Sequence, residues 1–206
     1  MNKGLLITLP QSDDVTEYLT VFSKPILDEC NVHGTKCKAL KKERANKKEF
    51  ESFLKSYDYN FIVLNGHGEE NSITGHKNKE IIKKGENSKL LHGRITYARS
   101  CWAAAGLGEC YNNDKSGCFI GYNIPFMFLI DTTRATNPVK DKVAEVFFET
   151  SNRIPIGIIK GQSVDQAHEN SKKAMLKSIK KHCSGEIKIL RLLQKYFGII
   201  IPGKLL

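Results

Sequence analysis

Short apolar runs alternate with amphipathic helical patterns along the chain, and this alternation constrains the fold more than any other feature of the sequence. The runs have the length of buried strands, and the stretches between them place apolar residues at helical spacing. Such an alternation builds βαβ units, so the sequence predicts an α/β fold with a mostly parallel sheet and helices on both faces. The predicted strands are 5–9, 36–41, 61–64, 95–100, 118–122 and 199–201, with a small hairpin at 72–74 and 80–82.

Capping residues mark where the helices begin. The predicted caps are Ser12, Asn46, Asn137 and Ser163. Pro25 is expected to kink or shorten the first helix, Pro138 to be the first residue of the third, and Gly185 to end the last. The residues predicted to line the buried face of the third helix are Val139, Val143, Val146, Phe147 and Thr150.

The length and the apolar content limit the class of protein. The chain has 206 residues, of which 40% are hydrophobic, and this suits one globular domain. No apolar run reaches the roughly 18–20 residues that a membrane span needs. The N-terminal apolar run is too short for a secretion signal. We therefore expect a cytoplasmic protein that has no membrane partner.

The net charge of +10 comes from 32 Lys and Arg against 22 Asp and Glu. Such a surplus raises the possibility of a nucleic-acid partner. Lysine outnumbers arginine, however, and arginine is the residue whose planar fork reads phosphates and bases. Two basic runs, 36–48 and 172–181, are interpreted as solvated surface, the second because it has helical spacing. The composition favours this interpretation over nucleic-acid binding.

Six cysteines form no Cys-x-x-Cys pair, and a disulfide framework is not expected in the cytoplasm. Cys30, His33 and Cys37 are close enough in the sequence to supply three metal ligands. A structural zinc site needs four ligands, and the second pair is missing. We therefore predict no metal site, and most of the thiols are expected to be buried and inert.

Two predicted strands end in reactive side chains. The run 61–64 is followed by His67 between two glycines, and the run 95–100 is followed by Cys101 and then by small residues. If these strands are neighbours, both side chains lie at the carboxyl edge of the sheet, where function gathers in α/β folds. A cysteine with a histidine is a nucleophile with its base. The backbone amides of Gly68 and Cys101 are candidates for an oxyanion hole. The alternative is a turn histidine and an unrelated core thiol.

The two motifs resemble those of a known family. The segments "NGHG" at 65–68 and "ARSCWAAAG" at 98–106 are similar to the His-Gly and Ala-Cys motifs of caspase-like (clan CD) cysteine peptidases, in particular the bacterial CHAT branch related to separase. The hairpin at 72–82 matches the family pattern, and so does the stretch 143–175. The resemblance covers roughly residues 60–180.

The resemblance implies a fold and a reaction. It implies that residues 1–206 form a single caspase-like peptidase domain, a three-layer sandwich. It also implies peptide-bond hydrolysis through a thioester, with His67 as the base, Cys101 as the nucleophile, no required third residue, and no metal or organic cofactor. The order of the pair, histidine before cysteine, differs from that of papain-like enzymes.

The family also sets specificity by one pocket residue, which is acidic in relatives that cut after Lys or Arg. Asp131 and Asp114 are the candidates for that residue here, which predicts a basic P1 residue. The sequence departs from the family at Arg99-Ser100, at the bulky Trp102 and in the long stretch 123–137. These departures leave an inactive peptidase homologue as an alternative.

The function expected from these features is a cysteine endopeptidase that acts on protein substrates. The resemblance further implies a role in regulated bacterial systems such as antiviral defence, with a separately encoded regulatory or effector protein as partner. Two other classes stay open. One is a non-catalytic basic module that binds nucleic acid or an acidic protein. The other is a different cysteine hydrolase or acyl transferase that uses the same pair.

Overall fold

A computed structural model describes residues 4–111 and 117–182. Its centre is a sheet of five strands in the order β2-β1-β3-β7-β8, and every neighbouring pair is parallel. This confirms the predicted α/β fold with a parallel sheet. The strands are β1 (Gly4–Leu9), β2 (Cys37–Lys41), β3 (Tyr59–Asn65), β7 (Ile95–Arg99) and β8 (Cys118–Ile120).

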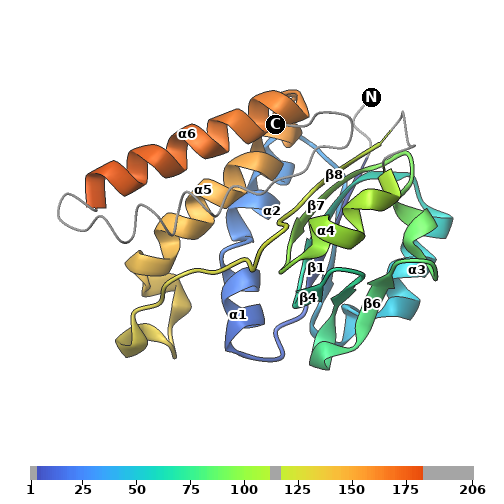
Figure 1. Cartoon of the computed structure of the whole chain (residues 1–206), viewed down its shortest axis with the longest axis horizontal. Helices are drawn as coiled ribbons and strands as arrows, with labels where there is room; N and C mark the ends of the chain where they lie inside the picture. Colours follow the sequence, from blue (N-terminus) through green and yellow to red (C-terminus); the bar gives the residue numbers. More distant parts are fainter. Residues whose placement is uncertain (1–3, 112–116, 183–206) are drawn as a thin grey trace.

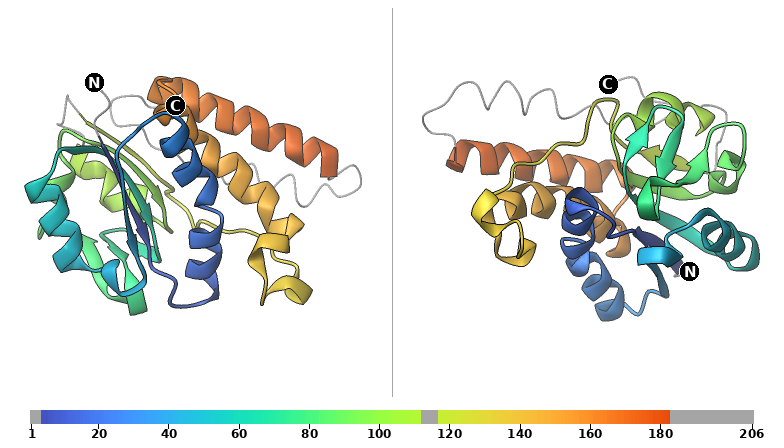
Figure 2. Two further views of the ribbon diagram at one scale, coloured as in Figure 1. Left: turned by 180° about the vertical axis from the view of Figure 1, so that it is seen from behind. Right: turned by 90° about the horizontal axis from the view of Figure 1, so that it is seen from below.

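Helices cover both faces of this sheet (Figure 1). One face carries α1 (Asp14–Val21), α2 (Lys24–Val32) and α5 (Lys142–Ile159), and α6 (Val164–His182) packs outside α5. The opposite face carries α3 (Lys47–Ser56) and the short α4 (Ala103–Gly106), as the view from behind also shows (Figure 2). The 3₁₀ turns are η1 (Lys42–Arg44), η2 (His76–Asn78), η3 (Ser88–Leu91), η4 (Gly108–Tyr111), η5 (Thr132–Arg134) and η6 (Pro138–Lys140).

Each face of the sheet has its own hydrophobic core, because successive side chains of a strand point to opposite faces. In β1, Leu5 and Ile7 pack with Ile26 and Ile154 on the α2 and α5 side. Leu6 packs with α3 and α4 on the other side. A third, aromatic cluster joins α1 to α5 beside the sheet, and it comprises Tyr18, Leu19, Phe22, Ala144 and Phe148.

A second, small antiparallel sheet begins directly after His67. Its order is β4-β5-β6, with β4 (Gly68–Glu69), β5 (Ser72–Thr74) and β6 (Glu80–Lys83). The hairpin predicted at 72–74 and 80–82 is confirmed. The first of its three strands was not expected, because its two residues are too few to show a pattern.

The predicted start of the first helix was wrong by one residue. Asp13, not Ser12, is the N-cap, since its carboxylate accepts a hydrogen bond from the Thr16 amide at 2.9 Å. Pro25 does shorten the helix, as predicted. The chain forms two helices, and Pro25 lies in the first turn of the second, where a missing amide proton costs nothing.

The predicted start of the long helix was also wrong. Asn137 and Pro138 begin only the turn η6, whereas α5 begins at Lys142. The Asp141 carboxylate caps α5 by accepting hydrogen bonds from the amides of residues 143 and 144, at 3.0 and 2.9 Å. The expected buried face was therefore wrong in part: Val139 is 66% exposed and Val143 is 43% exposed, while Ala144 and Phe148 are buried. Thr150 is buried, as predicted.

The last predicted helix is confirmed at its start. Ser163 and Gln166 exchange hydrogen bonds between side chain and backbone, which is the capping box that the sequence predicts. The expected end at Gly185 and the strand at 199–201 lie outside the described residues. Within residues 4–111 and 117–182, no helix is both long and apolar enough to cross a membrane.

Candidate active site

Three neighbouring strands end at one edge of the sheet and bring three reactive side chains there. Strand β3 pairs with β7 so that Asn65 lies opposite Arg99. His67 and Cys101 each follow two residues after these paired positions. Strand β1 lies on the other side of β3, and Asp13 follows its end. The sheet order therefore places His67 between Asp13 and Cys101.

Gly68 shows how closely the two loops approach each other. A Cβ atom at Gly68 would lie 2.0 Å from the Ser100 Oγ and 2.7 Å from the Cys101 carbonyl oxygen. No real Cβ tolerates such distances, so only glycine fits here. The loop that carries His67 thus packs directly against Ser100 and Cys101. The fold therefore contains the neighbouring strand ends that the sequence predicts.

The His67 imidazole is held by Asp13. Its Nε2 lies 3.0 Å from the Asp13 Oδ2, and the two side chains are 39% and 34% exposed. The His67 carbonyl accepts a hydrogen bond from the Thr74 amide at 2.9 Å, which fixes the loop to strand β5. The pKa of Asp13 is lowered: burial opposes the charged form, but hydrogen bonds from Thr16 and His67 outweigh burial.

Asp13 is the site residue that sequence reasoning missed. The signal was present, because Asp13 and Thr16 form a capping box. Ser12 offered the same kind of cap one residue earlier and was preferred. The contact with His67 joins positions 54 residues apart, and local pattern does not reveal contacts of that range.

The Cys101 thiol is half-buried and points to a backbone carbonyl. Its Sγ donates a hydrogen bond to the Phe126 oxygen at 3.9 Å. Burial raises the pKa of the thiol, so this arrangement favours the neutral form. Although both residues are described, no hydrogen bond joins His67 to Cys101. Catalytic hydrogen bonds are often absent or long in free enzymes and form in the substrate complex.

The two amides predicted for an oxyanion hole are those of Gly68 and Cys101, and that role stays a prediction. The Cys101 amide makes no backbone hydrogen bond with any described residue. In an antiparallel ladder, successive residues turn their amides alternately toward and away from the partner strand. The His67 carbonyl faces β5, so the Gly68 amide points away from β5 and is not used by that ladder.

Trp102 follows Cys101 in a strained conformation. Its φ of 58° and ψ of −1° lie in the left-handed region, which costs a bulky L-residue on the order of 1–2 kcal/mol. The Trp102 amide donates to the Ile124 carbonyl at 3.2 Å and holds the turn. Strain of this kind clusters at functional sites. The conformation leaves the indole 40% exposed, beside the hollow described next.

An acidic hollow of about 360 Å³ lies next to Trp102. Its lining comprises Glu69, Glu70, Asn71 and Trp102. Neither glutamate forms an ion pair with a described residue. The hollow joins the loop after His67 to the residue after Cys101, and it presents two carboxylates in a chain whose net charge is +10.

Of the two aspartates predicted for the specificity pocket, the structure describes only Asp131. Asp114 lies outside the described residues. Asp131 caps η5, where its Oδ1 accepts hydrogen bonds from the amide and the hydroxyl of Thr133 at 3.0 and 2.7 Å. The role of Asp131 in specificity stays a prediction.

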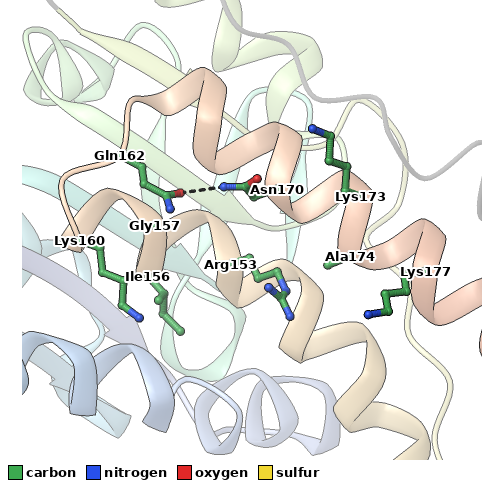
Figure 3. Close-up of a pocket in the computed structure, with 9 residues that line it drawn as sticks. All are labelled: Arg153, Ile156, Gly157, Lys160, Gln162, Asn170, Lys173, Ala174 and Lys177. Atoms are coloured by element: carbon green, nitrogen blue, oxygen red, sulfur yellow. Dashed lines mark hydrogen bonds between the residues drawn. The ribbon is translucent and has the colours of Figure 1, made fainter.

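A basic groove of about 410 Å³ runs between α5 and α6, away from the strand ends (Figure 3). Four cationic side chains line it, and none of its lining residues is acidic. Figure 3 shows that these side chains point in different directions and do not converge on one position. They are Arg153, Lys160, Lys173 and Lys177.

The possible metal ligands do not form a metal site. In residues 4–111 and 117–182, no three His, Cys, Asp or Glu side chains are grouped so that they could hold a metal ion. His33 lies 2.8 Å from a Glu29 oxygen, and Cys30 is buried in the core beneath α2.

The fold and the site together define an α/β protein with an aspartate, a histidine and a cysteine at the carboxyl edge of a parallel sheet. No family model and no curated protein matches the chain. Among solved structures, the RcsB response regulator of Salmonella typhimurium, from a study of its conformational dynamism for DNA interaction, is 12% identical to this chain. The alignment covers 94% of this chain and 99% of that chain with a TM-score of 0.30, which is too low to support any functional argument.

Proposed function

We propose that the protein is a cysteine endopeptidase of the caspase-like class, with Cys101 as nucleophile and His67 as general base. The observation that carries the proposal is the pairing of β3 with β7, which delivers both residues to one edge of the sheet. The close packing of Gly68 on residues 100 and 101 supports it. The resemblance of the two motifs to that class supplies the choice of reaction.

The reaction follows from these groups. His67 takes the thiol proton, and the Cys101 sulfur attacks the carbonyl carbon of the substrate peptide bond. The amides of Gly68 and Cys101 stabilise the oxyanion of the tetrahedral intermediate. His67 returns the proton to the leaving amine, and a thioester forms. A water molecule, deprotonated by His67, then attacks the thioester, which releases the acid and restores the thiol.

One contact of the Cys101 thiol has to break before this reaction starts. The thiol donates to the Phe126 carbonyl, so it has to leave that acceptor before His67 can take its proton. In this proposal, the thiol turns away from the Phe126 carbonyl when the substrate binds at the edge of the sheet. The raised pKa of Cys101 keeps the sulfur protonated until then.

The acidic hollow supports cleavage after Lys or Arg. Glu69 and Glu70 offer charge to a basic P1 side chain, and the exposed Trp102 ring offers a face for its cation or aliphatic stem. In this proposal the two glutamates, which the sequence did not single out, take the part first expected of Asp131 or Asp114. The proposal that the substrate is a protein of a bacterial defence system, or of another regulated system, rests only on the family resemblance.

Cleavage of a proteome tests the reaction. Wild type, Cys101→Ala and His67→Ala are incubated with a cell extract, and new protein termini are mapped by mass spectrometry. Both variants are expected to lose all wild-type cleavages, while Cys118→Ala, a control at another half-buried cysteine, keeps them. If Cys101→Ala leaves the cleavages intact, the proposed mechanism is wrong.

A library of fluorogenic peptides that varies P1 tests the specificity. Wild type is expected to prefer Lys or Arg, and the double variant Glu69→Gln, Glu70→Gln to lose roughly 10-fold or more in kcat/KM on these peptides, because each exposed charge pair contributes up to about 1 kcal/mol. Asp131→Asn serves as the comparison. A preference for acidic P1 residues would contradict the assignment.

The basic groove favours a second candidate function, a module that binds an extended anionic partner. Arg153 and Lys160 already pair with Glu149 and Glu29, so the support comes from Lys173 and Lys177, which form no ion pair with a described residue, and from the lack of acidic lining residues. The divergence of the four side chains makes the groove a poor site for one compact phosphate. Binding of a single-stranded oligonucleotide that weakens steeply with salt, and that Lys173→Glu with Lys177→Glu abolishes, would establish it.

A further inference from the structure

We infer that Asp13 is a positioning residue that orients the His67 imidazole toward Cys101. This inference rests on the proposed function. It starts from the 3.0 Å contact between the Asp13 Oδ2 and the His67 Nε2. Neither the family resemblance nor the sequence pattern requires such a residue, so the contact itself carries the inference.

The Asp13 carboxylate is fixed before it meets the imidazole. Its Oδ1 accepts hydrogen bonds from the amide and the hydroxyl of Thr16, at 2.9 and 3.0 Å. The Thr16 hydroxyl oxygen in turn accepts from the backbone amides of Ser12 and Asp13. The Oδ1 of Asp13 thus caps α1. The Oδ2 contacts His67, and its position is fixed by the start of α1 and by the end of β1.

This contact indicates which of the two ring nitrogens of His67 carries the proton. A carboxylate only accepts hydrogen bonds, so the Nε2 of a neutral His67 carries the proton that is donated to Asp13. The other nitrogen, Nδ1, then has the free electron pair that a general base needs. Because β3 lies between β1 and β7, Asp13 holds the ring from one side and Cys101 follows the strand on the other side.

The role of Asp13 is comparable to that of an aspartate which orients a catalytic histidine. Orientation matters here because burial raises the pKa of the Cys101 thiol, so the thiol gives up its proton only to a base whose free electron pair faces the sulfur. In wild type, the Asp13 carboxylate holds the ring in one orientation. Without that contact the ring can turn, and the proton transfer that starts the reaction becomes less favourable.

The variant Asp13→Asn tests the inference with little damage to the fold. Asparagine caps a helix as well as aspartate does, so α1 is retained, while the charge and the obligatory acceptor beside His67 are lost. We expect kcat to fall roughly 10- to 100-fold with KM unchanged, less than the ~10⁴-fold effect in a serine protease whose aspartate is buried. Asp14→Asn is the matched control, since Asp14 is the next residue of the same helix turn and makes no contact with His67.

Nuclear magnetic resonance of ¹⁵N-labelled histidine gives a readout that a purely structural role would not move. Wild type and Asp14→Asn are expected to show His67 as a single tautomer that is protonated at Nε2, and Asp13→Asn to lose that preference. Asp13→Ser, which keeps a capping oxygen but is too short to reach the ring, should behave like Asp13→Asn and replaces it if Asp13→Asn fails to fold.

The outcomes separate the inference from the proposed function. If Cys101→Ala abolishes cleavage but Asp13→Asn matches Asp14→Asn in kcat and in the His67 tautomer, Asp13 is not a positioning residue and the peptidase proposal stands. If Cys101→Ala cleaves as wild type does, the proposed function fails, and the role of Asp13 in it fails as well. A lower kcat with an unchanged tautomer would also overturn the inference.

Discussion

Arg99 is the largest side chain that is fully buried in the described part of the chain, and no carboxylate pairs with it there. Its guanidinium donates to four neutral oxygens and lies 5.6 Å from the centre of the Phe148 ring. The acceptors are the Asn65 Oδ1, the Asn152 Oδ1, the Leu19 carbonyl and the Ser23 hydroxyl. Arg99 therefore ties β7 to β3, α5 and the end of α1, one layer beneath the candidate site.

Replacing Arg99 by lysine should destabilise the protein by about 2–3 kcal/mol, because a buried acceptor left without its donor costs about 1–3 kcal/mol. The ammonium group of a lysine at this position reaches fewer of the four acceptors than the planar guanidinium of Arg99 does. Denaturation in urea measures the change. Arg153→Lys, at an exposed arginine, should change stability by less than about 0.5 kcal/mol. Equal effects of the two substitutions would show that the buried network contributes little.

At the scale of residues, the sequence predicted the candidate site residues that their immediate neighbours in the sequence mark. Glycines around His67 and small residues after Cys101 marked both positions, and the fold brings their loops together. Asp13 and Arg99 were not predicted, because their partners lie far away along the chain. An arginine at the end of a strand is usually solvated. Arg99 is buried because its guanidinium contacts Leu19 of α1, Ser23 and Asn152 of α5.

At the scale of elements, the start of α5 illustrates how one buried carboxylate joins two helices. Asp141 is fully buried. It caps α5, and its Oδ2 accepts hydrogen bonds from the Tyr18 hydroxyl at 2.8 Å and from the Asp131 amide at 2.9 Å. Its pKa is lowered: burial opposes the charge, but hydrogen bonds from Ala144, Tyr18 and other donors outweigh burial. The same contact and burial raise the pKa of Tyr18 to about 12.

Asp141→Ala should destabilise the protein by about 2–3 kcal/mol at neutral pH, from the lost cap and the orphaned Tyr18 hydroxyl. Because the folded-state pKa lies below the ordinary value of 3.8 for an aspartate, the charge of Asp141 contributes its full stability above about pH 4. That contribution is lost as the pH falls through the folded-state pKa, so the difference between wild type and variant should shrink in acid. Urea denaturation from pH 7 to pH 2 measures it.

Asp131→Ala is the control for that prediction, since its carboxylate caps only the exposed turn η5. It should cost less than about 1 kcal/mol. A constant difference between wild type and Asp141→Ala down to pH 2 would contradict the assignment of the cap to the charged form.

The elements themselves followed from the sequence except where two capping signals competed. Ser12 stood next to Asp13, and Asn137 with Pro138 stood four residues before Asp141. In both cases the residue that also meets a distant partner is the cap: Asp13 binds His67 and Asp141 binds Tyr18. Local propensity ranks these caps as equals, and tertiary contacts decide between them.

At the scale of the whole molecule, the charge of +10 bears on which partners the protein attracts. A protein with this surplus attracts acidic proteins over distances of about a Debye length, which is ~10 Å at 0.1 M salt. If the protein is a peptidase, kcat/KM for an acidic protein substrate should fall by roughly 10-fold between 20 and 300 mM salt through slower association.

A neutral fluorogenic peptide with the same cleavage sequence is the control for the effect of salt, and its kcat/KM should stay within about twofold, because steering acts on charged partners. Stopped-flow measurements over the same range of salt separate association from chemistry. Parallel losses for both substrates would mean that salt acts on the enzyme and not on the encounter.

The three layers could be predicted from the alternation of strands and helices, whereas the order of the strands could not. Periodicity assigns each run to a strand, but it does not say that β3 lies between β1 and β7. That order depends on which helices cover which face, and it decides which side chains meet at the carboxyl edge. The candidate pair was thus predictable, and its third neighbour, Asp13, was not.

The sheet order also bears on what happens while the chain is being synthesised. Asp13 and His67 leave the ribosome before Cys101 does, and β7 has to pair with β3 before the cysteine takes its place beside them. Pairing between strands that are distant in the sequence is a slow step of folding. A growing chain therefore keeps the cysteine away from the histidine until the sheet has formed. In the proposed peptidase, this delay keeps newly made copies from cutting one another before they are folded.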